Sequence, residues 1–526
     1  MPQTQHPRRE AMDGMTAAAY AAYALSDAAL IYPITPASKM AETVERWACE
    51  GRENLFGAPV DVKEMQSEKG VAGAFHGALS GGALASTFTA SQGLMLMIPN
   101  LYKVSGELLP GVLHVTCRSL STHALSIFGD HQDVMAVRAT GVAMLASATV
   151  QECMDLSLVA HLSAIDGSVP FCHFFDGFRT SDAIETVDVI EPEAMAPLVD
   201  RDAVRAFRAR AMEPEHPDIR GTAQNPDIYF QNREAANPSY DALPAVVQAN
   251  MDKVAKLTGR RYHLFDYDGA PDAERVVVTM ASSAQVAKEC VAHLVAAGEK
   301  VGVVTVRLYR PFSAEHLLDA IPATAKRIAV LDRTKEPGSL GEPLYGDVAL
   351  AVLSSGRPVE VLGGRYGLSS KDFTPAQVKA VFDNMALEEP RRRFTVGIDD
   401  DVTHLSLPVG GPVRCLPGPC SQAVFYGFGS DGTVGASKQV ARILSREQGA
   451  CVQEYSWYDS KKSGGLTICY LRLSDRPVQS PYLVDDAGYV ACHKSTYVRR
   501  GYPMADRLAE GGTFVLNAPW ADAASW

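Results

Sequence analysis

Two polar residues near the start of the chain stand at places where a small anion is readily bound. Thr35 follows an apolar run and precedes Pro36, a pair typical of a helix N-terminus, whose free N–H groups attract a carboxylate. Arg118 follows the apolar run Val112–Cys117, at the end of an expected strand, where a guanidinium can bind a small carboxylate in bidentate fashion. Simple helix capping and a structural arginine remain the alternatives.

A third candidate is Glu68, which precedes the small-residue stretch Gly70–Leu79. A carboxylate beside an uncharged stretch is either buried for a function or is an ordinary acid of a first helical turn. Residues 70–102 contain no Asp, Glu, Lys or Arg, but polar residues, glycines and a proline interrupt them. The stretch therefore predicts a buried helix–strand–helix segment and not a membrane span.

Two motifs near the end of the chain suggest phosphate chemistry. The loop Gly427–Gly435 matches G-x-G-x-x-G between an expected strand and an expected helix, and Glu454 follows at the spacing of a dinucleotide site. Other phosphates or a tight turn alone are the alternatives. Lys461 and Lys462 precede two glycines, which is consistent with phosphate binding or with a solvated turn.

Strands that alternate with helices must position these residues, so the chain is predicted to be α/β with several parallel-sheet domains. The expected strands are Ala28–Tyr32, Ala83–Thr89, Val112–Cys117, Val169–Phe175, Arg275–Met280, Val301–Val306, Ile328–Leu331 and Ala423–Tyr426. Helices are expected from a Ser282 or Ser283 cap to about Ala297, over Phe373–Met385, and after the glycine-rich loop to about Leu444. Residues 187–258 are predicted to be a long loop-like connection that wraps another domain or a partner.

Composition excludes several classes of function. The 526 residues suffice for three or four domains, and a net charge of −12 argues against nucleic acid or an anionic membrane as a partner. Residues 1–14 show no secretory signal, and a cytoplasmic location is expected. Ten scattered cysteines form no C-x-x-C, and His123 and His131 lack a third ligand at a recognisable spacing, so no metal site or iron–sulfur cluster is predicted.

Together these segments resemble the pyruvate:ferredoxin (flavodoxin) oxidoreductases, which are thiamine diphosphate enzymes. The resemblance covers nearly the whole chain. It rests on Tyr32–Pro36, Glu64–Glu68, Arg118–Asp133, Phe174–Thr180, Arg220–Asp227, Arg307–Phe312, Asp332–Gly338 and Tyr458–Gly465.

The resemblance implies that pyruvate is oxidised with coenzyme A to acetyl-CoA and CO2, with electrons passed to ferredoxin or flavodoxin, in a homodimer. It implies that Glu68 is a catalytic residue that hydrogen-bonds the aminopyrimidine ring of thiamine diphosphate. Thr35 and Arg118 would be catalytic residues that hold the pyruvate carboxylate. The basic run before Gly464 and Gly465 further motivates the hypothesis that Lys461 and Lys462 contact coenzyme A.

The resemblance also implies three domains. Residues 1–258 would form a transketolase-like pyrimidine-binding and pyruvate-binding domain with a long C-terminal linker, residues 259–412 a transketolase C-terminal-like domain, and residues 413–526 an incomplete gamma-type α/β domain. Mg²⁺ and the 4Fe–4S clusters are expected only in a missing C-terminal part, so the thiamine diphosphate site is shared and the isolated chain is expected to be inactive. The alternatives are a truncated, non-catalytic chain and an NAD-linked dehydrogenase that uses Gly427–Gly435.

Overall fold

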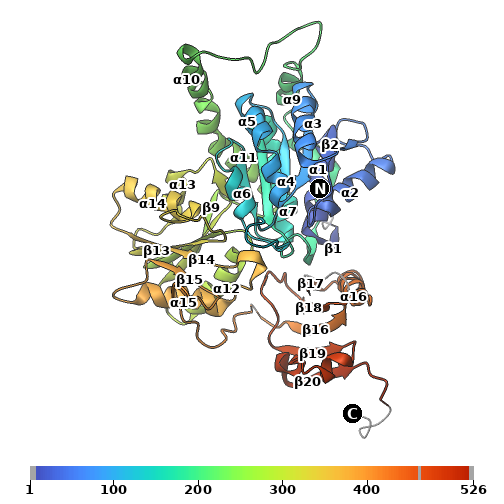
Figure 1. Ribbon diagram of the computed structural model, residues 1–526, viewed down its shortest axis with the longest axis vertical. Coiled ribbons are helices and arrows are strands. Elements are labelled where there is room, and N and C mark those ends of the chain that lie inside the picture. The colour runs from blue at the N-terminus through green and yellow to red at the C-terminus, as the bar shows by residue number, and fades with distance from the viewer. Residues whose placement is uncertain (1–7, 417, 460–463, 521–526) are drawn as a thin grey trace, which may run out of the picture. The chain divides into compact units, whose positions relative to one another are not determined.

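The computed structural model describes residues 8–416, 418–459 and 464–520, and the chain divides into two compact units (Figure 1). The larger unit comprises residues 15–181 and 190–415 and contains two sheets. The smaller unit comprises residues 1–14, 182–189 and 416–526 and contains one sheet. The predicted α/β class is confirmed.

The first sheet of the larger unit has the strand order β12-β6-β7-β5-β4-β2-β3, and only β12 is antiparallel to its neighbour. Its strands are β2 (Ala28–Ile31), β3 (Asp61–Glu64), β4 (Ala85–Thr89), β5 (Val112–Cys117), β6 (Ala143–Ser147), β7 (Phe171–Asp176) and β12 (Leu308–Arg310). Its helices are α1 (Gly14–Ala24), α2 (Ser38–Cys49), α3 (Glu68–Ser80), α4 (Ser91–Leu96), α5 (Ile98–Gly106), α6 (Gln132–Val137) and α7 (Val150–Gly167). Every residue of β4, β5, β6 and β7 is buried, as expected for parallel strands covered on both faces.

The second sheet of the larger unit has the order β15-β14-β13-β10-β11-β9, and β9 alone is antiparallel to its neighbour. The strands are β9 (Phe265–Gly269), β10 (Arg275–Met280), β11 (Val301–Val306), β13 (Arg327–Asp332), β14 (Glu360–Arg365) and β15 (Arg393–Thr395). The helices are α12 (Ser283–Ala296), α13 (Ala314–Ala320), α14 (Pro343–Ser355), η2 (Leu368–Ser370) and α15 (Pro375–Ala386). Ser282 stands at the N-cap position of α12, as predicted, but its side chain makes no capping hydrogen bond, and Ser283 Oγ donates to the Met280 carbonyl at 2.8 Å.

The predicted loop-like connection over residues 187–258 is largely helical. It contains α8 (Pro192–Met195), η1 (Ala196–Leu198), α9 (Arg201–Arg208), α10 (Pro226–Glu234) and α11 (Asn237–Thr258). Pro238 lies in the first turn of α11, where the missing N–H costs nothing, so this proline begins the helix instead of marking a loop. Helix α11 buries Leu243, Val247 and Met251 and packs on α7. The irregular part is the green loop between α9 and α10 (Figure 1).

The smaller unit holds a mixed sheet in the order β1-β8-β17-β18-β16-β19-β20, parallel only between β16, β19 and β20. Its elements are β1 (Arg9–Asp13), β8 (Ile184–Asp188), β16 (Ser421–Phe428), α16 (Thr433–Gln448), β17 (Cys451–Tyr458), β18 (Leu466–Ser474), β19 (Ala487–Cys492), α17 (Thr496–Arg499), η3 (Met504–Arg507) and β20 (Leu508–Leu516). The strand and helix expected on either side of the glycine-rich loop are confirmed. The boundaries expected at 258/259 and 412/413 remain predictions.

A chain of three buried histidines runs through the core of the first sheet. His173 on β7 and His114 on β5 join through their Nδ1 atoms at 3.0 Å, and His114 Nε2 lies 3.1 Å from Nε2 of His161 on α7. Ser147 Oγ lies 2.8 Å from His173 Nε2 and donates its own hydrogen to the Glu152 carbonyl, so His173 Nε2 must donate to Ser147. The neutral rings of His114 and His173 then each donate once and accept once, and His161 donates from Nε2 to His114. Burial lowers the pKa of all three, that of His114 to about 3.

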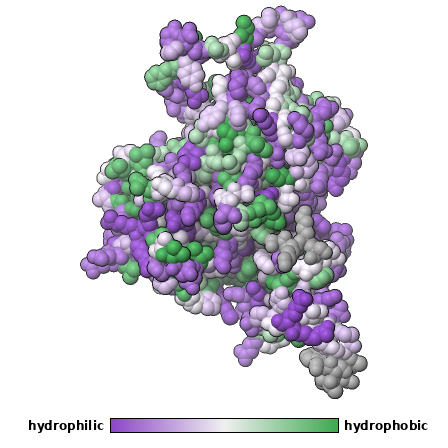
Figure 2. Space-filling view, viewed as in Figure 1, coloured by the Kyte–Doolittle hydropathy of each residue, from purple (hydrophilic) through white to green (hydrophobic). Residues whose placement is uncertain are grey.

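The surface mixes polar and apolar residues over the face seen in Figure 2. Among the described residues, no helix combines the length and the apolar character that crossing a bilayer requires.

Candidate functional site

The three residues singled out from the sequence lie at one edge of the first sheet. Thr35 follows β2, Glu68 is the first residue of α3, which follows β3, and Arg118 directly follows β5. These strands are parallel, so their carboxyl ends meet at the same edge. The structure brings Thr35 and Arg118 into contact, since Arg118 Nη1 donates to the Thr35 carbonyl oxygen at 2.8 Å.

The predicted role of Thr35 as a helix cap is wrong. Helix α2 begins at Ser38, with Ala37 at the N-cap and no side-chain cap. A turn bond joins the Ser38 N–H to the Ile34 carbonyl at 3.0 Å, and Thr35 lies in this turn before the helix. The Thr35 side chain is exposed, and its hydroxyl has no partner among the residues that the structure describes. It is therefore available to a ligand.

The Arg118 guanidinium is half-buried and only partly satisfied. Nη1 bonds the Thr35 carbonyl, and Nε lies 3.5 Å from the Ser126 carbonyl. Within the described ranges, Nη2 has no acceptor. Burial lowers the pKa of Arg118, and the Asp133 carboxyl opposes that shift, but an arginine keeps its charge at neutral pH. A free, charged donor beside a threonine hydroxyl suits a small carboxylate.

The Glu68 carboxylate is buried and lacks a protein partner. Ser67 caps α3 by accepting from the Gly70 N–H at 3.2 Å, and Glu68, the next residue, is only 8% exposed. No described residue forms a hydrogen bond or ion pair with its carboxylate. A Cβ added at Gly93 would lie 2.8 Å from Glu68 Oε1 and 2.7 Å from Thr89 Oγ1, and that hydroxyl is also buried without a partner. Such unsatisfied polar atoms indicate a place for a polar ligand.

A buried polar network joins the two sheets of the larger unit behind this edge. Asp176, at the end of β7, accepts from Arg333 Nη1 at 2.9 Å and from the Ser282 N–H at 2.9 Å, and lies 2.8 Å from His131 Nε2. Burial alone would raise the pKa of Asp176, but the charges of Arg333 and His131 outweigh it and lower that pKa. Asp176, His131 and Arg333 lie in stretches that carry the resemblance, but the sequence did not show that they form one network, because they are far apart along the chain.

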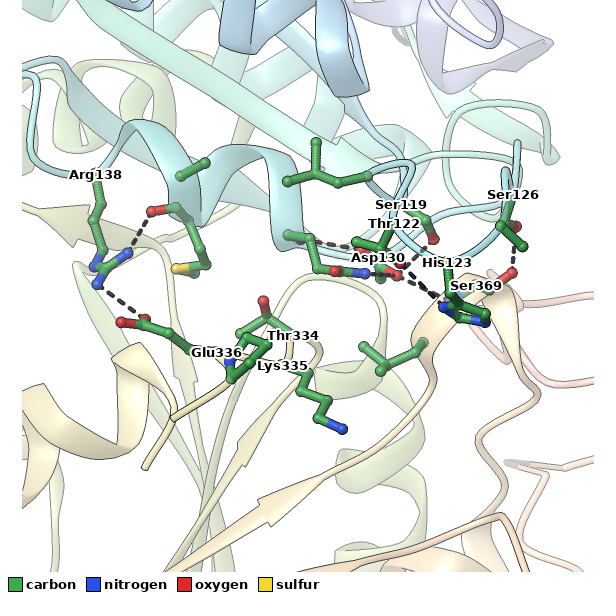
Figure 3. Close-up of a pocket in the computed structure, with 17 residues that line it drawn as sticks. Ser119, Thr122, His123, Ser126, Asp130, Arg138, Thr334, Lys335, Glu336 and Ser369 are labelled. Atoms are coloured by element: carbon green, nitrogen blue, oxygen red, sulfur yellow. Dashed lines mark hydrogen bonds and ion pairs between the residues drawn. The ribbon is translucent and has the colours of Figure 1, made fainter. Parts of the chain in front are cut away.

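A cavity of about 710 Å³ lies beside the segment that follows Arg118. It is lined by residues between 119 and 130, by one face of α6 and Arg138, and by residues 334–337 and 368–369. Figure 3 shows Arg138 paired with Glu336, at 3.0 Å, and Asp130 accepting from Ser119 Oγ at 2.6 Å. Part of the stretch that carried the resemblance, Arg118–Asp133, therefore forms one wall of this cavity.

The glycine-rich loop of the smaller unit does not have the geometry of a dinucleotide site. The Asp431 carboxylate accepts from the Phe428 and Thr433 N–H groups at 2.7 and 2.8 Å, so a side chain of the protein already occupies the anion position. Glu454 lies within β17, fully buried, and accepts from Ser456 Oγ at 2.7 Å, so it cannot reach a ribose. Strand β18 also separates β16 from β17. The dinucleotide interpretation of this loop is therefore wrong.

The two lysines assigned to coenzyme A, Lys461 and Lys462, lie outside the described residues. Their contacts stay a prediction.

Three family models match the chain in succession. Residues 20–252 match the thiamine diphosphate-binding domain of pyruvate flavodoxin/ferredoxin oxidoreductases. Residues 273–378 match core domain II of pyruvate:ferredoxin oxidoreductase, and residues 422–525 match a further domain of pyruvate ferredoxin/flavodoxin oxidoreductases. The segment that carries Thr35, Glu68 and Arg118 thus lies inside a thiamine diphosphate-binding domain.

Curated relatives extend the match to nearly the whole chain. A pyruvate:ferredoxin oxidoreductase of Moorella thermoacetica is 60% identical over 513 residues, which are 98% of this chain and 44% of the relative. A pyruvate-flavodoxin oxidoreductase of Klebsiella pneumoniae is 54% identical over 517 residues, again 98% of this chain and 44% of the relative. The chain thus spans less than half the length of these relatives.

A solved structure shares the fold. The 2-oxoglutarate:ferredoxin oxidoreductase of Magnetococcus marinus superposes with a TM-score of 0.53 at 18% identity, over 72% of this chain and 65% of that one.

Proposed function

The chain belongs to the pyruvate:ferredoxin/flavodoxin oxidoreductase family, and on that premise we propose that it supplies the pyruvate side of a thiamine diphosphate site. The completed enzyme would convert pyruvate and coenzyme A to acetyl-CoA and CO2 and pass the released electron pair to ferredoxin or flavodoxin. The observation that carries the proposal is the buried Glu68 carboxylate, which has no partner among the described residues and faces Gly93.

The residues of the site fit this cofactor and substrate. Glu68 would accept a hydrogen bond from the aminopyrimidine ring and fix its tautomer, a task that requires a carboxylate free of protein partners. Arg118 Nη2 and the Thr35 hydroxyl, both unengaged within the described part of the chain, would hold the pyruvate carboxylate. When bound, thiamine diphosphate supplies the electron sink for the loss of CO2. The protein supplies the orientation of substrate and ring.

The remaining parts of the proposal concern what completes the enzyme. The relatives are more than twice as long as the segment that matches this chain, since the match covers 44% of them. We place the Mg²⁺ and diphosphate contacts and the 4Fe–4S clusters in that additional sequence. Lys461 and Lys462 would contact coenzyme A, and the enzyme would be a cytoplasmic homodimer.

The carboxylate-binding role predicts the effect of Arg118→Met in the completed enzyme. Loss of a hydrogen bond to a charged group, worth about 1.5–3 kcal/mol, should lower kcat/KM for pyruvate roughly 10- to 150-fold, chiefly through KM. Steady-state reduction of a viologen dye by pyruvate and coenzyme A measures this. Arg138→Met, which removes an arginine paired with Glu336, is the control and should keep the wild-type KM. An unchanged KM in Arg118→Met would refute the role, and the 526-residue chain alone should show no turnover.

The close approach of Gly93 to Glu68 gives a second prediction. Gly93→Ala would place a Cβ 2.8 Å from Glu68 Oε1 and force the carboxylate away, so activity should fall about tenfold or more. The control is Gly73→Ala in α3, where a Cβ has no atom within 4 Å. That control should keep full activity and gain about 0.5–1 kcal/mol in the free energy of unfolding, because alanine is the better helix former. Equal activities of the two variants would contradict the assignment.

A further inference from the structure

A second buried acid lies behind the proposed site. Asp133 is fully buried near the start of α6, and its carboxylate accepts three backbone N–H groups. Oδ2 accepts from Ser91 at 2.8 Å and from Arg118 at 2.9 Å, and Oδ1 accepts from Val134 at 2.8 Å. One carboxylate oxygen therefore joins the residues that follow β4 and β5.

The Asp133 side chain links the two segments just beyond the point at which the backbone pairing of β4 with β5 ends. The paired registers of β4 and β5 end at Thr89 and Val115. Beyond that point the β4 chain turns away at Ser91, whose φ of 52° is in the left-handed region. Ser91 Oγ adds a bond to the Ser119 carbonyl at 2.7 Å, so the same two segments are tied twice.

Each tied segment carries one half of the proposed site. Arg118 presents the guanidinium that contacts the Thr35 carbonyl. Two residues after Ser91, Gly93 forms the wall against which the Glu68 carboxylate lies. The distance between the substrate-binding guanidinium and the cofactor-binding carboxylate is therefore set through the two amides that Asp133 Oδ2 accepts.

We propose that Asp133 is a positioning residue, which fixes the Arg118 backbone relative to the Ser91–Gly93 turn and so sets the pyruvate carboxylate at the correct distance from the cofactor. The inference rests on the proposed function. Asp133 would touch neither substrate nor cofactor and would act only through these backbone groups.

The surroundings of Asp133 indicate that its side chain serves as a hydrogen-bond acceptor at a fixed place, and not as one half of an ion pair. Burial raises its pKa to about 7, and the amides of Arg118, Ser91 and Val134 lower the pKa only in part, while Asp130 raises it further. Among the described residues, no cation forms an ion pair with the carboxylate: the Arg118 guanidinium bonds the Thr35 carbonyl, and His131 lies against Asp176. A buried acid without a cation is costly, so the amide bonds must offset that cost.

Three variants of the completed enzyme distinguish the effect of where the Asp133 acceptor oxygen lies from the effect of its charge. Asp133→Asn can keep one acceptor oxygen toward the Ser91 and Arg118 amides, while it removes the charge and the bond from Val134. Asp133→Glu keeps the charge and moves the carboxylate by one methylene. Asp133→Ala removes the acceptor. We expect KM for pyruvate near the wild-type value in Asp133→Asn and raised about 10- to 100-fold in Asp133→Glu and Asp133→Ala.

The ranking of the three variants by KM for pyruvate tests the inference. If Asp133→Ala does not fold, the comparison of Asp133→Asn with Asp133→Glu is sufficient. A KM in Asp133→Glu closer to wild type than that in Asp133→Asn would show that charge matters, and would overturn the inference. So would an unchanged KM in all variants, or a loss of kcat alone. A wild-type enzyme without pyruvate-dependent viologen reduction would instead refute the proposed function.

Asp332 offers a matched control. It is also buried, its pKa is also raised to about 7 by burial, and it accepts from the Leu344 and Tyr345 N–H groups at 3.0 Å. Asp332→Asn and Asp332→Glu should change thermal stability as the Asp133 variants do, and should leave KM for pyruvate unchanged. A rise in KM in the Asp332 variants would show that any such buried acid affects the site.

Discussion

Glu68→Gln is expected to lower kcat of the completed enzyme by about 10²–10⁴-fold, the usual contribution of a group that acts on a proton in the transition state. Glutamine has almost the same shape, but its amide is a far weaker acceptor and cannot favour the required tautomer of the aminopyrimidine ring. KM for pyruvate should change much less, because the substrate carboxylate would bind to Arg118 and Thr35. The measurement is viologen reduction at saturating cofactor.

The same substitution should leave the fold intact or stabilise it. Glu68 is 8% exposed and bonds to no described residue, so glutamine removes a buried charge without breaking a protein contact. A melting temperature equal to or above that of the wild type, together with the loss of kcat, would mark a residue kept for function. Glu64→Gln, an exposed acid at the end of β3, is the control and should retain activity. Activity within threefold of the wild type in Glu68→Gln would remove the assigned role.

Acidification should destabilise the larger unit through the chain of buried histidines. Their pKa values are lowered in the fold, so the unfolded chain binds more protons once the pH drops below about 6.5. Stability from these residues is complete above that pH and is lost as the pH falls toward the folded pKa values. Three such groups should together cost about 4 kcal/mol of the free energy of unfolding at pH 5.5 relative to pH 8.

Denaturant unfolding of wild type and His161→Gln at pH 8, 6.5 and 5.5, followed by circular dichroism, measures this effect. The variant should lose about 1.4 kcal/mol less than the wild type between pH 8 and 5.5, because one titrating group is gone. Buried carboxyls with raised pKa values, such as Asp133 and Asp332, shift stability in the opposite direction but cancel in the difference between the two proteins. His293→Gln, at an exposed position of α12, should follow the wild type. Parallel curves for His161→Gln would contradict the prediction.

The buried strands could be read from the sequence because burial on both faces leaves a simple pattern. The bounds expected for β5, β10 and β11 coincide with those of the structure. In a parallel sheet covered on both faces, each central strand is a short apolar run that ends where polar loop residues begin. The ends of these strands, and with them the place of Arg118, followed directly.

The wrong secondary-structure predictions concern residue types that are common in two kinds of local structure. Pro238 and its neighbours suggested a loop, yet proline is also favoured in the first turn of a helix, and α11 begins there. Thr35-Pro36 suggested a helix start, but α2 begins at Ser38. The local sequence does not separate these cases, because the deciding contacts, such as the packing of α11 on α7, are tertiary.

The residues of the candidate site also differ in how far the sequence identifies them. Thr35, Glu68 and Arg118 each stand next to a strand or helix end that the sequence reveals. Asp133 lies in the stretch Arg118–Asp133 that carries the resemblance, but the sequence does not reveal its role. That role rests on the backbone amides of Ser91 and Arg118, and any residue type supplies an amide.

The sheet of the smaller unit cannot be completed in the order in which the chain is synthesised. Glu185 on β8 pairs with Gln453 on β17, a partner 268 residues later. At about 5–20 residues per second, a ribosome needs roughly 15–50 s to deliver that partner, and until then the β8 edge of the β1–β8 pair stays open. Charged residues along this pair, such as Arg9 and Asp188, which bond at 2.9 Å, would discourage a neighbouring nascent chain from adding to that edge.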